Sequence, residues 1–355
     1  MVAVRRWTGR EATALQNAVR LPVRDFALYL GVDPKTVTGW RRGGAAIEPR
    51  PDTQAILDTA LSQCTAEQLE RFHQGLAQYE AGPAYSRSSA PVPLDYEQWN
   101  DDLDRAAVAV GRQGFHLASS LVDRWRLRAA GHHRLDEKGL YLAARGLVLL
   151  GDVRRDQGAL AGPGSARLAY AEGLEIFREL DIPRRAAQVE LALAVVQEMS
   201  GGLSASARSY RKLARDSRLD PRDQARARLW VGTALSKLGQ NGPAIKLMTS
   251  AARQFEDLGE PEEWSIAHQK IALAHRGAGQ LDQAQKVIVI AGNTRVDDSP
   301  MQQVRLNTAQ AHILVTDPAT REAGLGLLDR CEQIAMQYGL SHQQRAIATI
   351  RAVAS

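Results

Sequence analysis

The side chains best suited to contact a polyanion lie on one predicted helical face near the beginning of the chain. At 100° per residue, Lys35, Thr38, Gly39 and Arg42 project from the same side of a helix. That side carries a cation at each end and a glycine between them, and Arg41 adds a cation next to its end. The face is therefore suited to lie in a groove with negatively charged walls.

Two short helices joined by a tight turn must position this face. In the first helix, Phe26 and Leu30 share an apolar side, and Gly31 takes the left-handed position that ends the helix. The second helix begins with Asp33 as its N-cap and Pro34 at its first position, where no backbone donor is needed. The residues that turn inward to close a small core are Val32, Val37 and Trp40.

This arrangement resembles the helix-turn-helix of the XRE family, the regulators of the Cro and lambda-repressor type. The residues that carry the resemblance are Phe26, Ala27, Leu30, Gly31, Val32, Val37, Trp40 and Gly43, with flanking helices at 12–20 and 51–61. The resemblance implies that the second helix enters the major groove of double-stranded DNA and contacts bases and phosphates. The DNA-contacting residues that it implies are Lys35, Thr36, Thr38, Gly39, Arg41 and Arg42. The alternative is a small helical domain whose arginines are merely solvated.

The charge of the chain is concentrated at the same end. The 355 residues include 45 basic and 40 acidic side chains, which gives a formal net charge of +5. The first 50 residues hold nine Lys or Arg against four Asp or Glu, so they account for the whole excess. This distribution indicates a polyanion-binding module joined to a neutral body.

Several other classes of protein are not indicated. No run approaches the 18 apolar residues of a membrane span, and residues 1–10 lack the apolar core of a secretory leader. Cys64 and Cys331 are too few for a disulfide framework, so a reduced, cytoplasmic location is expected. We expect no metal, no cofactor and no enzymatic activity. The glycine-rich run at 158–165 lacks the Lys-Ser/Thr of a phosphate-binding loop and predicts an interhelical loop.

The composition predicts an all-α chain with two domains. Only 5 % of the residues are aromatic, and Ala, Leu, Arg and Gln recur throughout, which favours helices over strands. Residues 81–98 are rich in Pro, Ser and Gly and predict a linker. This linker would separate a helix-turn-helix domain at 1–80 from a helical-repeat domain at 99–355.

Internal repetition organises the second domain. Alanines recur 36 to 40 residues apart. A glycine lies five positions before three of them and a small residue lies twelve positions before three, which allows antiparallel helices to approach closely. The alanines are Ala171, Ala207, Ala244, Ala284 and Ala323; the small residues are Gly202, Gly239 and Gly279, then Gly232, Ala272 and Ala311. The pattern resembles tetratricopeptide repeats, which implies an α-solenoid over 139–340. A further helix pair is expected at 99–131 and a closing helix at 342–354.

If the tetratricopeptide register holds, the first helix of each pair lines a concave face. The polar and cationic residues on that face are Arg226, Thr233, Lys237, Gln269, Arg276, Arg305, Thr308 and His312, and the apolar ones are Val189, Ala192, Val196 and Met199. Such a groove suits a short peptide with an acidic group or free carboxylate, or a small-molecule effector. The alternative is that these residues belong to solvated helix faces.

The two domains together resemble bacterial regulators in which a repeat domain senses a signal and controls DNA binding. These include the peptide receptors of the Rgg and PlcR type and many actinobacterial regulators. The resemblance implies a homodimeric transcription factor whose repeats dimerise and bind an effector. The alternative is an interaction scaffold whose repeats hold a partner protein, with weak or incidental DNA binding.

Overall fold

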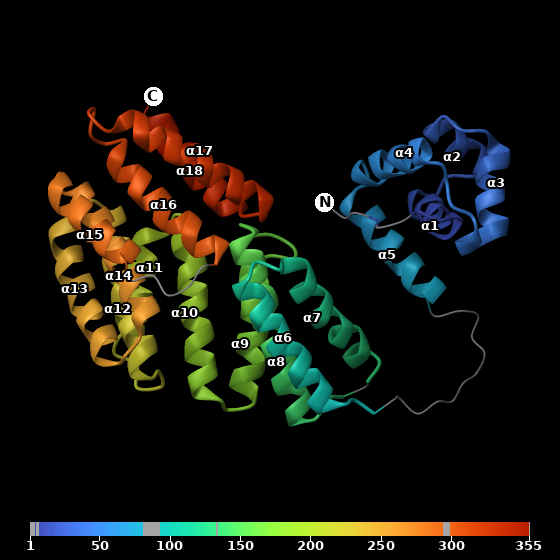
Figure 1. Cartoon of the computed structure of the whole chain (residues 1–355). Coiled ribbons are helices and arrows are strands. Elements are labelled where there is room, and N and C mark those ends of the chain that lie inside the picture. Colours follow the sequence, from blue (N-terminus) through green and yellow to red (C-terminus); the bar gives the residue numbers. More distant parts are fainter. Residues whose placement is uncertain (1–3, 5–6, 81–92, 133, 294–298, 355) are drawn as a thin grey trace. The chain divides into compact units, whose positions relative to one another are not determined.

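The structure, a computed structural model, describes residues 4, 7–80, 93–132, 134–293 and 299–354. These residues form eighteen α-helices and one 3-10 turn, which confirms the predicted all-α fold. The chain divides into two compact units, Met1–Ala90 and Pro91–Ser355 (Figure 1). Residues 81–92 of the predicted linker lie outside the described residues. The predicted linker extends too far, because a helix already begins at Tyr96. The Asp95 carboxylate caps this helix by accepting a hydrogen bond from the Gln98 amide at 2.9 Å.

The first unit packs five helices around one small core. They are α1 (Gly9–Val19), α2 (Val23–Leu30), α3 (Pro34–Gly43), α4 (Pro51–Ser62) and α5 (Ala66–Glu80), with the 3-10 turn Gly44–Ala46 after α3. Leu15, Phe26, Trp40 and Phe72 are buried at the centre. Helices α1 and α3 approach so closely that a Cβ atom at Gly9 would lie 2.5 Å from the Trp40 carbonyl oxygen. A larger residue than glycine would therefore separate these two helices.

The turn between α2 and α3 has the predicted geometry. Gly31 has a φ of 68°, in the left-handed region, and ends α2. The Asp33 carboxylate then caps α3 by accepting a hydrogen bond from the Lys35 amide at 2.7 Å. Val37 and Trp40 are buried against the rest of the unit. The opposite side of α3 is consequently turned toward solvent.

The second unit is a series of antiparallel helix pairs closed by a single helix (Figure 1). The pairs are α6 (Tyr96–Gly111) with α7 (Phe115–Ala130), α8 (Glu137–Asp156) with α9 (Ala166–Glu179), α10 (Pro183–Met199) with α11 (Leu203–Leu213), α12 (Pro221–Lys237) with α13 (Asn241–Asp257), α14 (Pro261–Gly277) with α15 (Leu281–Asn293), and α16 (Pro300–Leu314) with α17 (Arg321–Gln337). The closing helix is α18 (Ser341–Ala354). This order confirms the predicted solenoid, its additional first pair and its closing helix.

The predicted repeat register is confirmed in the central pairs and wrong at both ends. The predicted alanines that are buried are Ala207, Ala244 and Ala284. Ala171 is only half-buried and Ala323 is exposed. In α17 the buried small residue is Gly324, where a Cβ atom would lie 2.6 Å from Val315. The register shifts there because α17 packs against the closing helix α18 and not against a further repeat.

Gly232 is required by the close contact between α12 and α13. A Cβ atom there would collide with the Met248 side chain and lie 3.1 Å from the Ala244 carbonyl oxygen. We expect Gly232→Ala to lower the free energy of unfolding by about 1–3 kcal/mol, as overpacking does, in chemical denaturation of the full chain. The matched control is Gly242→Ala in α13, whose Cβ atom would meet nothing within 4 Å. Equal losses in both variants would contradict this explanation.

The beginning and the end of the second unit are joined to each other. Arg345 of α18 donates a hydrogen bond at 2.9 Å to the carbonyl oxygen of Gly158, in the glycine-rich loop between α8 and α9. The Met301 amide at the start of α16 donates to Oε1 of Gln113, between α6 and α7, at 3.2 Å. Gly158 has a φ of 78°, and a side chain there would collide with the Arg345 guanidinium. Figure 1 shows α16–α18 turning back over the earlier helices of the unit.

Candidate binding surfaces

The outward face of α3 is cationic and open to solvent. Lys35, Arg41 and Arg42 are exposed, and none of them forms an ion pair within the described residues. Thr36 is exposed and Thr38 is half-exposed, with its hydroxyl donating to a carbonyl oxygen one helical turn earlier (2.9 Å). The structure thus brings the predicted DNA-contacting residues together on one short helix, with their positive charge uncompensated.

Gly39 lies between these cations, and the fold does not require it. Its φ is not positive, and a Cβ atom there would meet no atom within 4 Å. A glycine inside a helix costs about 1 kcal/mol of stability relative to alanine. The missing side chain therefore leaves room for an external partner to approach the helix backbone.

Arg226, the first of the predicted effector-binding residues, is neutralised within the second unit. Its Nε atom donates to Oε1 of Glu263 at 2.6 Å, and its Nη1 atom lies 3.6 Å from Asp223. Both carboxylates are buried. Arg226 therefore holds α12 to α14 and is not a free cation on the inner face.

Arg276 and His312 form a separate group near the C-terminal ends of α14 and α16. Arg276 donates to the Thr316 hydroxyl at 3.4 Å. Burial and the neighbouring Arg276 lower the pKa of His312 to about 4, so this ring is neutral at pH 7. Arg226 is bound to Glu263, near the start of α14. Arg276 lies 13 residues later in the same helix, which places it roughly 20 Å from Glu263. The predicted arginines therefore do not form one site.

Three more of the predicted residues are used in packing and do not line an open groove. The Thr233 hydroxyl is buried and donates to a carbonyl oxygen of its own helix at 3.2 Å. Gln269 is buried and donates to the Arg305 carbonyl oxygen at 2.8 Å. Thr308 is buried beside Cys331 of α17. All three side chains are buried, which corrects our expectation that they line an open groove.

Lys237 and Arg305, by contrast, belong to one cluster of polar side chains on the inner side of the second unit. We define this inner cluster as Asp152, Arg155, Asp156, Tyr170, Glu198, Tyr210, Lys237, Lys270, Arg305 and His342. Asp156 of α8 and Arg305 of α16 are 4.0 Å apart, although three helix pairs separate them in the chain. The inner cluster therefore extends across the inside of the closed series of pairs.

The α8 side of the inner cluster is a closed ion-pair network. Arg155 lies 2.8 Å from Oδ1 of Asp152 and 3.0 Å from Oδ1 of Asp156. The Tyr170 hydroxyl donates to Asp152 at 2.7 Å. Burial raises the pKa of the Asp152 carboxyl, an effect that Arg155 and Tyr170 oppose. Arg155 is therefore the cation that both of these carboxylates share.

Glu198 is the centre of a second paired group. This carboxylate is buried and accepts hydrogen bonds from the Tyr210 hydroxyl and from Nζ of Lys237, both at 2.8 Å. Glu198 precedes Lys237 by 39 residues, about one repeat length. Arg226 and Glu263 are similarly spaced, 37 residues apart. Opposite charges one repeat apart are thus the sequence signal by which these pairs could have been found.

Lys270 is one of the inner-cluster residues that the sequence did not single out. It is half-buried, its Nζ atom lies 5.8 Å from the centre of the Trp230 ring, and it forms no ion pair within the described residues. Burial, together with the nearby cations Lys237 and Arg305, lowers its pKa to about 8. Burial also lowers the pKa of Arg305. These two cations are less compensated than the others in the cluster.

Two further properties of the described residues limit the kinds of site that they form. No three His, Cys, Asp or Glu side chains among them are arranged to hold a metal ion. No helix in the described ranges combines the length and apolarity that crossing a bilayer requires.

The fold and these surfaces define a helical-repeat protein that begins with a small helical unit carrying a cationic face. Among solved structures, the chain is similar to a Rap protein complexed with Competence and Sporulation Factor, with 14 % identity, a TM-score of 0.51, and 97 % of this chain and 98 % of that chain covered. It is also similar to aspartyl phosphate phosphatase F from Bacillus subtilis, with 13 % identity, a TM-score of 0.52, and 99 % and 96 % covered. At these identities the likeness shows a shared fold. No family model and no curated protein sequence matches the chain.

Proposed function

We propose that the protein is a sequence-specific DNA-binding transcriptional regulator of the XRE type. The single observation that carries the proposal is the outward face of α3, where uncompensated cations flank a glycine that the fold does not need. A recognition helix that enters the major groove needs such a face, with cations for phosphates and guanines and a close backbone approach. The regulator acts as a homodimer whose two copies of α3 contact half-sites about one helical turn of DNA apart.

The second unit is, in this proposal, the sensor and dimerisation domain. Its support is the inner cluster, which holds incompletely compensated cations on the inside of a repeat fold. The Rap protein of similar fold was solved with Competence and Sporulation Factor. We infer that a short peptide binds on the inner side and that the protein acts by binding, without enzymatic activity or a cofactor. The peptide changes DNA affinity only if it binds two arrangements of the dimer with different affinities.

Gel-shift titration of genomic duplexes tests the DNA-binding function. Arg42→Ala is expected to weaken binding to every sequence and to reduce the slope of affinity against salt by about one, because one phosphate contact is lost. Lys35→Ala is expected to change sequence preference, by about 1–3 kcal/mol at one base pair. Lys246→Ala, on the exposed side of α13, is the control and is expected to bind like the wild type. Absence of duplex binding at low salt would favour the interaction scaffold instead.

A further inference from the structure

Four exposed cations of the second unit follow one line along α11. Arg208, Arg211 and Lys212 are exposed on this helix, and Arg215 is exposed in the turn directly after it. Ala214 keeps a right-handed helical conformation, and the Arg215 amide donates to the Lys212 carbonyl oxygen at 3.2 Å, so the turn continues the path of the helix. At 100° per residue, the four side chains lie within about 100° of the helix circumference. We call these four residues the α11 stripe.

The α11 stripe has no carboxylate to compensate it. Residues 203–215 contain no Asp or Glu, and none of the four cations forms an ion pair within the described residues. Asp216 comes next in the chain, but Arg218 holds its carboxylate at 2.7 Å. The second helices of the two neighbouring pairs, by contrast, carry charges of both signs. Their exposed carboxylates are Glu172, Glu175 and Glu179 on α9, and Glu256 and Asp257 on α13.

The fold does not account for all of this charge. The dipole of a helix favours cations in its last turn, which is where Arg211 and Lys212 lie. Arg208 lies one turn earlier, and like charges three and four positions apart on a helix repel each other. The α11 stripe is therefore unfavourable in the free protein, and an anion lying along it would relieve the repulsion.

We propose that the α11 stripe binds the phosphate backbone of duplex DNA, as a second contact surface in addition to the face of α3. This inference rests on the proposed DNA-binding function and adds a sequence-independent contact to it. A guanidinium group binds phosphate oxygens through two parallel hydrogen bonds. From Arg208 to Arg215 the stripe rises roughly 10 Å, which is the length of about three successive phosphates on one strand. Contacts to phosphates carry no sequence information, so the stripe raises the affinity for every duplex.

The same surface is poorly suited to a protein partner. Protein interfaces are centred on apolar and aromatic side chains, and their centres are depleted of charge. Within α11, which is described throughout, Ser204 is the one exposed residue outside the stripe, whereas Tyr210 and Leu213 are buried. A surface of cations and one hydroxyl group favours phosphate oxygens.

Salt titration of duplex binding by the full chain, followed by fluorescence anisotropy, tests the α11 stripe. The test variant combines Arg208→Gln, Arg211→Gln, Lys212→Gln and Arg215→Gln. At low salt it is expected to bind a random-sequence duplex about tenfold more weakly, or worse. The slope of log affinity against log salt is expected to fall by about three to four, because each lost phosphate contact removes nearly one unit. The ratio of affinities for a specific genomic fragment and the random duplex is expected to stay unchanged.

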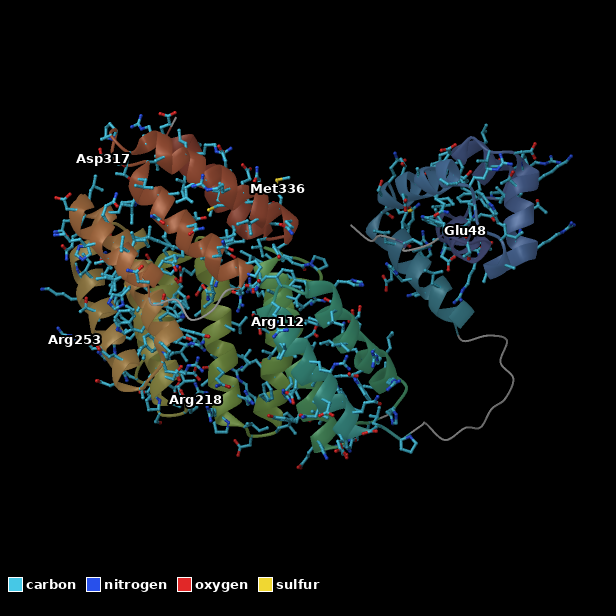
Figure 2. All side chains as sticks on the ribbon, in the orientation of Figure 1. Glu48, Arg112, Arg218, Arg253, Asp317 and Met336 are labelled. Atoms are coloured by element: carbon cyan, nitrogen blue, oxygen red, sulfur yellow. The ribbon has the colours of Figure 1, made fainter. Side chains whose placement is uncertain are left out.

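Two control variants separate the stripe from its net charge and from its folding. The first combines Lys246→Gln, Arg253→Gln, Lys286→Gln and Arg321→Gln, which removes four exposed cations that form no ion pair within the described residues and lie on three different helices. Figure 2 shows Arg253 pointing away from the unit. This variant is expected to keep most of the slope; an equal loss in both glutamine variants would assign the effect to net charge and overturn the proposal. The second combines Arg208→Lys, Arg211→Lys and Arg215→Lys, which keeps the charge and is expected to keep the slope.

Polyglutamate distinguishes phosphates from the carboxylates of an acidic protein. If the stripe glutamine variant binds the duplex like the wild type but binds polyglutamate more weakly, the surface serves an acidic protein and the proposal is overturned. Unchanged binding of both polyanions overturns the surface altogether. Lys35→Ala, measured on the same duplexes, tests the face of α3 separately. A lower salt slope in the stripe variant, together with an unchanged sequence preference in Lys35→Ala, would retain the stripe and contradict the proposed role of α3.

Discussion

Gly39→Ala is expected to make the first unit more stable and its binding to duplex DNA weaker. The added methyl group meets no atom of the protein and removes the entropic cost of a helical glycine, which stabilises by about 1 kcal/mol. In a unit of this size, that gain corresponds to a Tm rise of about 4–8 °C in calorimetry of the full chain. The same methyl group occupies the space through which a DNA groove would approach α3. We therefore expect an affinity loss of about tenfold or more in gel-shift titration.

Gly9→Ala provides the opposite control for this prediction. The new Cβ atom would lie 2.5 Å from the Trp40 carbonyl oxygen, so this variant is expected to lose stability and, with it, DNA binding. In Gly39→Ala, by contrast, stability and DNA affinity are expected to change in opposite directions. If it gains stability and binds duplex DNA like the wild type, α3 does not contact DNA through this face.

Arg155→Met is expected to cause the largest loss of stability in the second unit, about 3–5 kcal/mol in chemical denaturation of the full chain at pH 7. Arg155 is the only ion-pair partner of Asp152, and the closest one of Asp156, among the described residues. Removing it leaves two partly buried carboxylates without their main counter-ion. The matched control is Arg178→Met, because Arg178 is half-exposed and pairs with Glu175 and Glu190; its loss is expected to be below about 1 kcal/mol.

The pH dependence of Arg155→Met identifies the cause of its loss. Burial already raises the pKa of Asp152 in the wild type, and removing the cation raises it further. The folded state then binds more protons than the unfolded chain, so stability falls as pH rises through the raised pKa. We expect the variant to recover stability as the pH is lowered below 7, measured as the denaturation midpoint. A loss that does not change with pH would indicate missing side-chain packing instead of unpaired charge.

The parts of the fold that depend on local interactions were predictable from the sequence. Gly31 needs a left-handed conformation and Asp33 caps the next helix, so the geometry of the turn before α3 follows from adjacent residues. The central repeats were also predictable, because each second helix meets the same kind of neighbour. Ala323 was misplaced because the last pair packs against the closing helix, which a repeat period does not describe, whereas Ala171 is half-buried although helix pairs lie on both sides of its own.

The inner cluster was only partly predictable, because its contacts cross several repeats. Lys237 and Arg305 lie at positions that the period assigns to the inner face, and both belong to the cluster. Asp156 meets Arg305 from 149 positions earlier in the chain, and only the closure of the series brings them together. Arg226 has the residue type expected of an anion-binding side chain, yet the next repeat supplies Glu263 as its partner.

The contacts that join the beginning and the end of the second unit change how it loses structure. In an open array of repeats, stability is close to a sum of repeat and nearest-neighbour contributions, so the terminal repeats fray independently. Here Met301 on Gln113 ties the last pair to the first, and Arg345 on Gly158 ties the closing helix to the second pair. Fraying at either end must therefore break contacts at both. We therefore expect the unit to unfold cooperatively, and the deletion of one repeat to break the contacts between its two ends.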